Sequence, residues 1–415
     1  MAEASGGVPR VSPLFILWGG ELASRIGESF FQIALLWYLL ELTGNTATTG
    51  LLTMLTYLPA FVVGLWAGVV VDRLEYRRVL LLSNVARVAL AAALPLLYMA
   101  GVLPLAGIGV LGFLISSASA FFNPARDAII PLLAKRGGIS GVRLVKANSL
   151  VQSAWQFSIV VGPFLAAAML PFFPTVYLFF AVALAFAISL AVLLGLGFQP
   201  LTEPTGEAPP GNFLREFREG FGYLFRERRV FWIWVITVCN NFFLMGPVFV
   251  GIPHYVKSHL GGGGQDYALI EGIYAGGMIV STWLIARYGA RFNPLRVLFL
   301  ALIYDGFTYI PLLWVTSVEG TVLTILIHSL GIPAITISRI TALHHMVPQH
   351  MQGRVFSYFH LAVAGMTAIS LGVVGMVLLV LPANQLFLVI GLLAGSCGIV
   401  GLCIPSLWGN PMTQK

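Results

Sequence analysis

The stretch GLWAGVVVDRLEYRR, from Gly64 to Arg78, joins two long apolar segments through a short run of charged residues. Charged side chains and unpaired backbone groups are costly in lipid, so this hairpin must lie at a membrane face rather than inside the bilayer. We expect it to act there as a joint between two membrane-spanning helices.

The composition of the whole chain supports a membrane location. Of its 415 residues, 58% are hydrophobic and only 9% are charged. A soluble domain carries about 25% charged residues, which cover its surface. We therefore expect a polytopic membrane protein embedded in a lipid bilayer.

Breaks at charged residues, prolines and glycines divide the chain into twelve apolar segments, each near the roughly 20 residues that span a bilayer. They lie at about 14–42, 47–71, 79–100, 105–125, 147–170, 175–197, 229–256, 266–288, 294–315, 320–343, 354–380 and 384–405. The predicted fold is an all-α membrane protein with twelve transmembrane helices in two six-helix bundles. We expect the bundles at residues 1–197 and 229–415, with a cytoplasmic linker at 198–228.

Positive charge is unevenly distributed between the connections. Arginines and lysines cluster after even-numbered segments, whereas Lys257 is alone in the other connections. Positive charge beside a spanning segment is retained on the cytoplasmic side. We therefore expect a multi-pass protein of the inner (cytoplasmic) membrane with both termini in the cytoplasm. Topology also accounts for the net charge of +7, so we expect no nucleic-acid partner.

The two halves of the chain resemble each other. TWLIARYGARF, from Thr282 to Phe292, repeats the arginine spacing of the first hairpin with Arg287 and Arg291, but Ala286 replaces the aspartate. Such internal repetition is typical of transporters whose site lies between two bundles near the middle of the membrane.

Several motifs resemble the major facilitator superfamily. GVVVDRLEYRR, from Gly68 to Arg78, is similar to its signature loop, and FFNPARDAIIP places Pro124, Arg126 and Asp127 at the cytoplasmic end of a helix. With LVKANSL (144–150), VGP (161–163) and LLELTGNTATTG (39–50), these motifs resemble the bacterial drug and siderophore exporter branch. That branch includes macrolide efflux pumps and the enterobactin exporter.

The resemblance implies that the hairpin is a conformational latch. In the family, the loop aspartate and its arginines hold the bundles together on the cytoplasmic side. If this family feature applies to the present chain, the latch comprises Gly68, Asp72, Arg73, Arg77 and Arg78. Asp72 would then face the start of the eleventh helix near Arg354. A carboxylate near a helix N-terminus gains about 0.3–1 kcal/mol from the helix dipole. Alternatively, the arginines are only topology anchors.

The first apolar segment holds three charged residues on one helical face. In ELASRIGE, Glu21, Arg25 and Glu28 stand at i, i+4 and i+7. Glu28 falls about 21 Å along the helix, where an ionisable group normally faces a cavity or a partner. One arginine neutralises one carboxylate, so we expect the other, preferably Glu28, to carry a proton. The alternative is a structural Glu21–Arg25 pair, with Glu28 hydrogen-bonded to another helix.

Asp305 is a second acid at membrane depth, about 16 Å into the ninth segment. No basic residue lies within two helical turns of it in the sequence, so Asp305 must find a partner across the bundle or stay protonated. We expect it to take part in proton coupling or to contact a cation. Arg87 of the third segment is a candidate counter-ion.

Other side chains at membrane depth are candidates to line a cavity, although hydrogen bonds between helices explain them equally well. They are Gln152, Trp155, Gln156, Asn240, Asn241 and His328. Gly162 and Pro163 resemble the antiporter motif and predict a kink in the fifth helix, because proline removes a backbone hydrogen bond. We expect a similar break at Gly246 and Pro247 in the seventh helix.

We predict a secondary active transporter that exports an amphipathic organic compound, such as a drug, a macrolide or a siderophore, by proton antiport and alternating access. The chain has no nucleotide-binding motif, so transport must use an ion gradient or run downhill. We expect a monomer without enzymatic activity, cofactor or metal site. The alternatives are a lipid or lysolipid flippase, a metal-ion exporter of the same fold, or a membrane sensor that binds without transporting.

Overall fold

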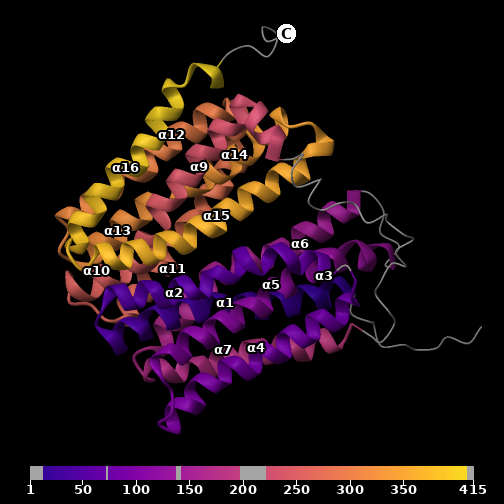
Figure 1. The fold of residues 1–415 in the computed structure, drawn as a ribbon, viewed down its shortest axis with the longest axis vertical. Coiled ribbons are helices and arrows are strands. Elements are labelled where there is room, and N and C mark those ends of the chain that lie inside the picture. Colours follow the sequence, from indigo (N-terminus) through magenta and orange to yellow (C-terminus); the bar gives the residue numbers. More distant parts are fainter. Residues whose placement is uncertain (1–12, 72, 137–141, 197–220, 409–415) are drawn as a thin grey trace, which may run out of the picture.

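The computed structural model describes residues 13–71, 73–136, 142–196 and 221–408, and these form mostly helices (Figure 1). Those of the N-terminal half are α1 (Pro13–Thr43), α2 (Thr46–Val62), α3 (Gly64–Val71), α4 (Tyr76–Met99), α5 (Leu105–Arg136), α6 (Val142–Met169) and α7 (Leu178–Leu194). Those of the C-terminal half are α9 (Arg228–Gly246), α10 (Ile252–Ser258), α11 (Gly264–Tyr288), α12 (Pro294–Phe307), α13 (Val318–Ser329), α14 (Ile332–Met346), α15 (Gln349–Val377) and α16 (Ala383–Cys403).

These helices occupy the positions of the twelve predicted spans. Within the described residues, nine helical segments are long and apolar enough to cross a membrane, and α2 and the later part of α6 are shorter apolar helices. The remaining span is α1, whose 31 residues include four charged side chains. Most of the predicted linker, residues 197–220, lies outside the described part of the chain.

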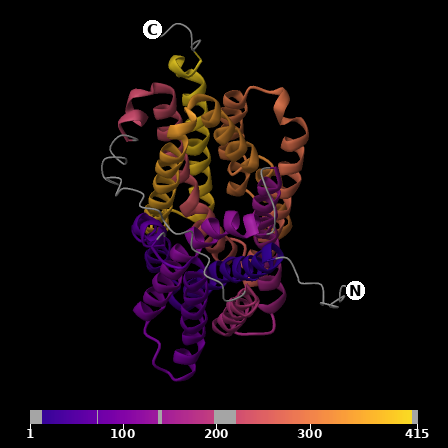
Figure 2. The ribbon, with the colours of Figure 1, turned by 90° about the vertical axis from the view of Figure 1, so that its right-hand side faces the viewer.

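The helices form two bundles. In the N-terminal bundle, α1 packs against α6 and α7, and α4 packs against α5 and α7. In the C-terminal bundle, α12 packs against α14 and α16, and α9 packs against α15 and α16. Figure 1 shows one bundle above the other, and the side view in Figure 2 shows the same two layers.

Two helix pairs join the bundles: α2 with α15, and α6 with α11. Gly50 and Gly375 bring α2 and α15 into backbone contact, because a Cβ on Gly50 would lie 2.6 Å from the Leu371 carbonyl oxygen and 2.9 Å from the Gly375 Cα. This contact lies near the connection from α1 to α2, at what we call the opposite end of the molecule. The end where α3 leads into α4 is the hairpin end. The bundles are therefore closed against each other at the opposite end.

Four of the predicted spans contain a break in the α-helix. The second breaks between α2 and α3, and the seventh has a π-helical turn at Pro247–Gly251, where a break was predicted. The ninth and tenth break after Phe307 and Ser329, and neither break was predicted. These last two lie side by side, since the Tyr304 hydroxyl donates to the Ile327 carbonyl oxygen at 2.5 Å. Broken helices at membrane depth supply polar groups that line cavities and bind ions.

The eleventh predicted span begins earlier than expected. α15 starts at Gln349, directly after Pro348, instead of near residue 354. Proline favours the entry to a helix because its φ angle is already close to the helical value. Arg354 therefore lies inside α15 rather than at its start.

α12 and α16 pack through glycines. A Cβ on Gly306 would overlap the backbone nitrogen of Gly395 and lie 2.6 Å from the carbonyl oxygen of Gly391. Further along, a Cβ on Gly398 would lie 2.7 Å from the backbone nitrogen of Ile303. The two backbones are thus in direct contact over several turns.

Candidate functional site

A cavity of about 720 Å³ lies between the two bundles. Its walls come mainly from α1, α2 and α5, and Ser357 and His360 of α15 complete it from the other bundle. The lining reaches Gly64 and Asp127 toward the hairpin end and stops at Leu36 toward the opposite end. The cavity therefore occupies the half of the interface that is not closed by the contact between Gly50 and Gly375.

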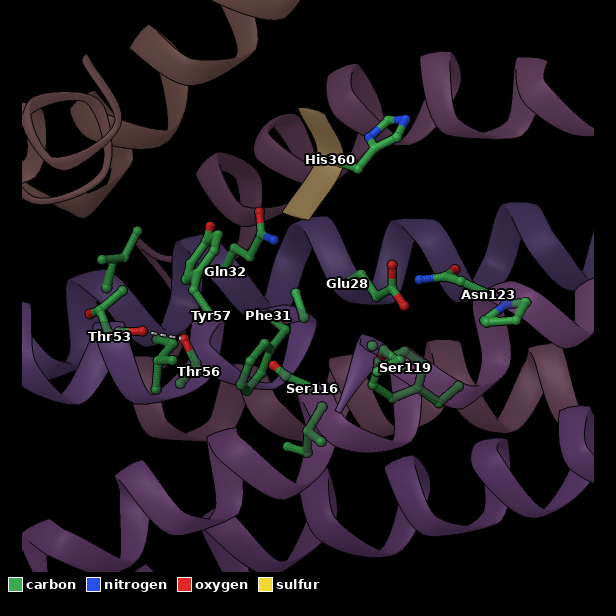
Figure 3. A pocket seen from close by; sticks show the side chains of 18 of the residues that line it. Glu28, Phe31, Gln32, Thr53, Thr56, Tyr57, Ser116, Ser119, Asn123 and His360 are labelled. Carbon is green, nitrogen blue, oxygen red and sulfur yellow. Dashed lines mark hydrogen bonds between the residues drawn. The ribbon is translucent and has the colours of Figure 1, made fainter. Parts of the chain in front are cut away.

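Both polar and apolar side chains line the cavity wall (Figure 3). Apolar surface comes from Phe31 and Phe186 and from aliphatic residues of α1 and α5. Hydrogen-bonding groups come from Gln32, Thr53, Thr56, Ser116, Ser119, Asn123 and His360. A largely apolar cavity with a few polar groups suits an organic ligand that carries both kinds of surface.

Arg25 holds the two acids of α1 together. Its Nε donates to Glu21 Oε1 at 2.7 Å, and one terminal nitrogen donates to Glu28 Oε2 at 2.8 Å. The other terminal nitrogen donates to Asn123 Oδ1 of α5 at 2.8 Å. The helical spacing therefore places all three charged residues on one face, as predicted. Glu21 also accepts a hydrogen bond from Arg126 of α5.

Arg87 of α4 is the second arginine on Glu28. Its side chain is 0% exposed and donates to Glu28 Oε1 and to Ser24 Oγ, both at 2.9 Å. The guanidinium also lies 4.2 Å from the ring centre of Phe122 and 4.7 Å from that of Phe186. Ring faces attract cations, and a buried charge needs such partners because it has left water. Glu28 is thus held between two arginines, and Arg87 pairs with Glu28 rather than with Asp305.

The C-terminal bundle encloses a different group of polar side chains. Asp305 is 0% exposed, and among the described residues neither of its carboxylate oxygens has a hydrogen-bond partner. The closest ionisable partner is His328, with its Nε2 at 3.5 Å from Asp305 Oδ1. The other ring nitrogen of His328 lies 2.9 Å from Thr308 Oγ1. Asp305 and His328 therefore meet where α12 and α13 both end.

The predicted cavity candidates lie elsewhere. Asn241 donates to the Val363 carbonyl oxygen at 3.0 Å and to Thr367 Oγ1 at 2.9 Å, so it joins α9 to α15. Trp155 is 42% exposed on the outside of α6. Among the described residues, Trp155, Gln156, Asn240, Asn241 and His328 do not line the central cavity. The position of the Gln152 side chain lies outside the described part of the structure.

The hairpin residues are described only in part. Asp72 lies outside the described residues, so the latch contact stays a prediction. Arg77 is buried and donates to the Leu194 carbonyl oxygen at 3.1 Å, which ties the hairpin to the end of α7. Arg78 forms an ion pair with Glu75 at 2.5 Å on the surface. Arg73 is exposed.

Gly162 has a packing role. α6 continues as an α-helix through Gly162 and Pro163, so the predicted kink does not break the helix. A Cβ on Gly162 would lie 2.6 Å from Ser29 Cβ of α1 and 3.3 Å from the Phe30 backbone nitrogen. Glycine at this position lets α1 and α6 approach closely and so fixes the side of the cavity that carries Glu28.

Sequence reasoning missed Glu271 of α11. Its carboxyl interacts electrostatically with Tyr57 of α2 and with Tyr267, so it lies at the interface between the bundles. Tyr57 lines the central cavity, and its hydroxyl has no hydrogen-bond partner among the described residues. The sequence could have identified this residue, because Glu271 is an acid within the eighth apolar segment and such acids mark candidate functional sites.

Residues 17–370 match the sequence model described as the Major Facilitator Superfamily. The chain belongs to this superfamily. The predicted family and fold class are thereby confirmed: this major facilitator protein has twelve membrane-spanning segments in two bundles. It is a multi-pass membrane protein of this superfamily.

Efflux pumps are among the curated relatives of this major facilitator protein. Macrolide efflux protein A of Streptococcus pyogenes is 24% identical over 275 residues, and the match spans 66% of this chain and 66% of that protein. The multidrug efflux pump Tap of Mycobacterium bovis is 24% identical, over 60% of this chain and 59% of that protein. The match thus spans between 59% and 66% of the length of these two relatives.

Solved structures share the fold. The nucleoside transporter NupG superposes with a TM-score of 0.75 at 12% identity, over 94% of this chain and 98% of that chain. The peptide transporter POT in complex with sulfate superposes with a TM-score of 0.70 at 16% identity, over 97% and 96% of the two chains. At these identities the likeness concerns the fold alone.

Proposed function

We propose that this protein exports an amphipathic organic compound in exchange for protons, by alternating access. The main support is the central cavity, where apolar and hydrogen-bonding groups surround the partly buried carboxylate of Glu28 between the bundles. The names of the efflux relatives agree with this substrate class. Closure at the opposite end, with the cavity on the hairpin side, corresponds to the state that takes up substrate from the hairpin side.

We further propose that the hairpin end faces the cytoplasm and that the protein works as a monomer, with one central cavity per chain. Arg77, Arg78, Arg228 and Arg229 lie at the hairpin end, and Lys257 lies at the opposite end. The positive-inside rule then gives the orientation.

The contacts favour Asp305 over Glu28 as the proton carrier. Glu28 accepts hydrogen bonds from Arg25 and Arg87, and two cations stabilise its charged form. Asp305 is fully buried beside His328 and the neutral side chain of Asn240, and among the described residues no arginine or lysine pairs with its charged form. A carboxyl that binds and releases a proton during the cycle needs such an uncompensated environment. Glu28 then serves to shape the substrate cavity.

The test uses purified protein in proteoliposomes. A thermal-shift screen of macrolides, siderophores, dyes and lysolipids first selects a compound that binds. Transport of that compound is then measured with and without an imposed pH gradient. We expect Asp305→Asn to reduce gradient-driven transport at least about tenfold while binding and substrate exchange continue, because the amide cannot carry a proton.

Glu28→Gln is the matched variant. We expect it to weaken substrate binding, whereas the remaining transport should still respond to the gradient. If Asp305→Asn keeps gradient-driven transport at the wild-type level, Asp305 is not the carrier. If Glu28→Gln binds substrate normally but its transport no longer responds to the pH gradient, Glu28 is the proton carrier. Selective binding of lysolipids without any response to a gradient would favour a flippase.

A further inference from the structure

A second cavity, of about 670 Å³, lies at the opposite end of the molecule. It shares no lining residue with the central cavity. One wall is the last turn of α1, with Trp37, Tyr38 and Glu41, and another is the connection 170–176. The third wall is the turn 263–265, which leads into α11 of the other bundle. This outer cavity therefore bridges the two bundles.

Glu41 is the acid of the outer cavity, and its carboxylate is held in a fixed position. Oε1 accepts a hydrogen bond from Trp37 Nε1 at 2.6 Å, and Oε2 accepts one from Thr175 Oγ1 at 2.6 Å. Both donors are neutral. The nearby cation, Lys257, donates instead to the Leu40 carbonyl oxygen at 2.8 Å. Within the described part of the chain, no ion pair neutralises Glu41, so its charge is free to attract a ligand.

Aromatic side chains line the cavity that holds this carboxylate, which is exposed to solvent. Trp37, Tyr38 and Tyr98 line the cavity with Phe172 and Phe173, and the last two are 78% and 51% exposed. Ring faces attract organic cations, most strongly when the cation is poorly hydrated. An aromatic wall around one uncompensated carboxylate is therefore suited to a hydrophobic cation and unsuited to an anion.

The wall from the second bundle exists only while the opposite end is closed. Trp37 stacks on Tyr267 of α11, with ring centres 6.0 Å apart and planes at 18°. Gly264 lies against the same indole, since a Cβ there would be 2.7 Å from Trp37 Nε1. Asp266 fixes the turn by accepting a hydrogen bond from the Gly263 backbone nitrogen at 2.7 Å. Separation of the bundles at this end would carry residues 263–265 away from Glu41.

We propose that the outer cavity is a regulatory site for a hydrophobic organic cation, which binds Glu41 and the surrounding rings and holds the opposite end closed. A ligand that binds one state alone shifts the equilibrium toward that state. Such a cation inhibits transport from the opposite side of the membrane without entering the central cavity. The inhibition, unlike the binding, depends on the alternating access proposed above.

Binding is tested with tetraphenylphosphonium on the purified protein in detergent. Leu42 lines the outer cavity and is 50% exposed, so Leu42→Cys reports on it through its labelling rate with a hydrophilic maleimide. Labelling of the native cysteines in the wild-type protein is subtracted. We expect saturating tetraphenylphosphonium to slow labelling at least about fivefold. In the double variant Leu42→Cys, Glu41→Gln, the concentration of tetraphenylphosphonium needed for protection should rise about tenfold.

Three controls locate the cation. Glu319→Cys, an exposed position at the same end, should label at one rate with and without tetraphenylphosphonium. The neutral analogue triphenylphosphine oxide should not protect Leu42→Cys. Asp127→Asn removes a carboxylate from the central cavity and should leave protection unchanged.

Absence of protection, or equal protection with and without Glu41→Gln, would overturn the proposal. Loss of protection with Asp127→Asn alone would place the cation in the central cavity and would also overturn it. If protection is found but the wild-type protein shows no gradient-driven transport, the cation site stands and the proposed antiport fails. In active proteoliposomes, Glu41→Gln should raise the inhibitory concentration about tenfold.

Discussion

The two bundles bury charge in different ways. In the N-terminal bundle, Glu28 lies between Arg25 and Arg87, and each contact is 2.8 or 2.9 Å long. In the C-terminal bundle, Asp305 has His328 at 3.5 Å, and no hydrogen bond to its carboxylate oxygens is made within the described part of the chain. A carboxylate paired with arginines holds the neighbouring side chains in place. An acid without a cationic partner can change its protonation state at a lower free-energy cost. This difference supports our proposal that the first bundle keeps the cavity in shape and the second responds to a proton.

The largest expected effect concerns Arg87. Arg87→Met removes a fully buried cation and leaves Glu28 Oε1 without its ionic partner, which should cost about 3–5 kcal/mol of stability. Thermal unfolding in detergent measures this loss. Arg78→Met is the control, because Arg78 is an exposed partner whose ion pair is worth about 0–1 kcal/mol. Equal losses in the two variants would mean that the N-terminal cluster is not held by its charges.

The second prediction compares the two acids directly. Glu28→Gln should lower stability by about 1.5–3 kcal/mol, because two arginines lose an ionic acceptor. Asp305→Asn should leave stability unchanged or raise it, since the amide replaces a buried group without a compensating cation. Both variants are measured by the same thermal unfolding assay. A destabilised Asp305→Asn and an unaffected Glu28→Gln would reverse the comparison.

The smallest effect concerns the aromatic rings around Arg87. Phe186→Leu removes one of the two ring faces that contact the guanidinium and should cost about 0.5–1 kcal/mol more than the volume change alone. Phe179→Leu on the same helix is the matched control, because that buried ring packs on Phe31 and Tyr38 instead. If both variants lose the same stability, the rings around Arg87 act only by filling space.

The parts that could be predicted from the sequence follow from local spacing. A helical period places Glu21, Arg25 and Glu28 on one face, and apolar length gives the twelve spans. The pairing of Arg87 with Glu28 joins residues 59 positions apart and depends on how α4 packs against α1. The breaks after Phe307 and Ser329 were missed for a related reason. They lie within apolar segments, and the sequence does not show that their polar groups meet across two helices.

The glycine contact between α12 and α16 has a mechanical consequence for Asp305. Because the two backbones touch at Gly306, Gly395 and Gly398, neither helix can slide or rotate on the other without a steric clash. The pair should therefore move as a stiff plate that carries Asp305. His328 lies on α13, at the joint before α14, and is not part of this plate. We expect flexing at that joint to change the distance between His328 and Asp305. A conformational step at one helix joint would then change the proton affinity of a carboxyl whose own helix keeps its shape.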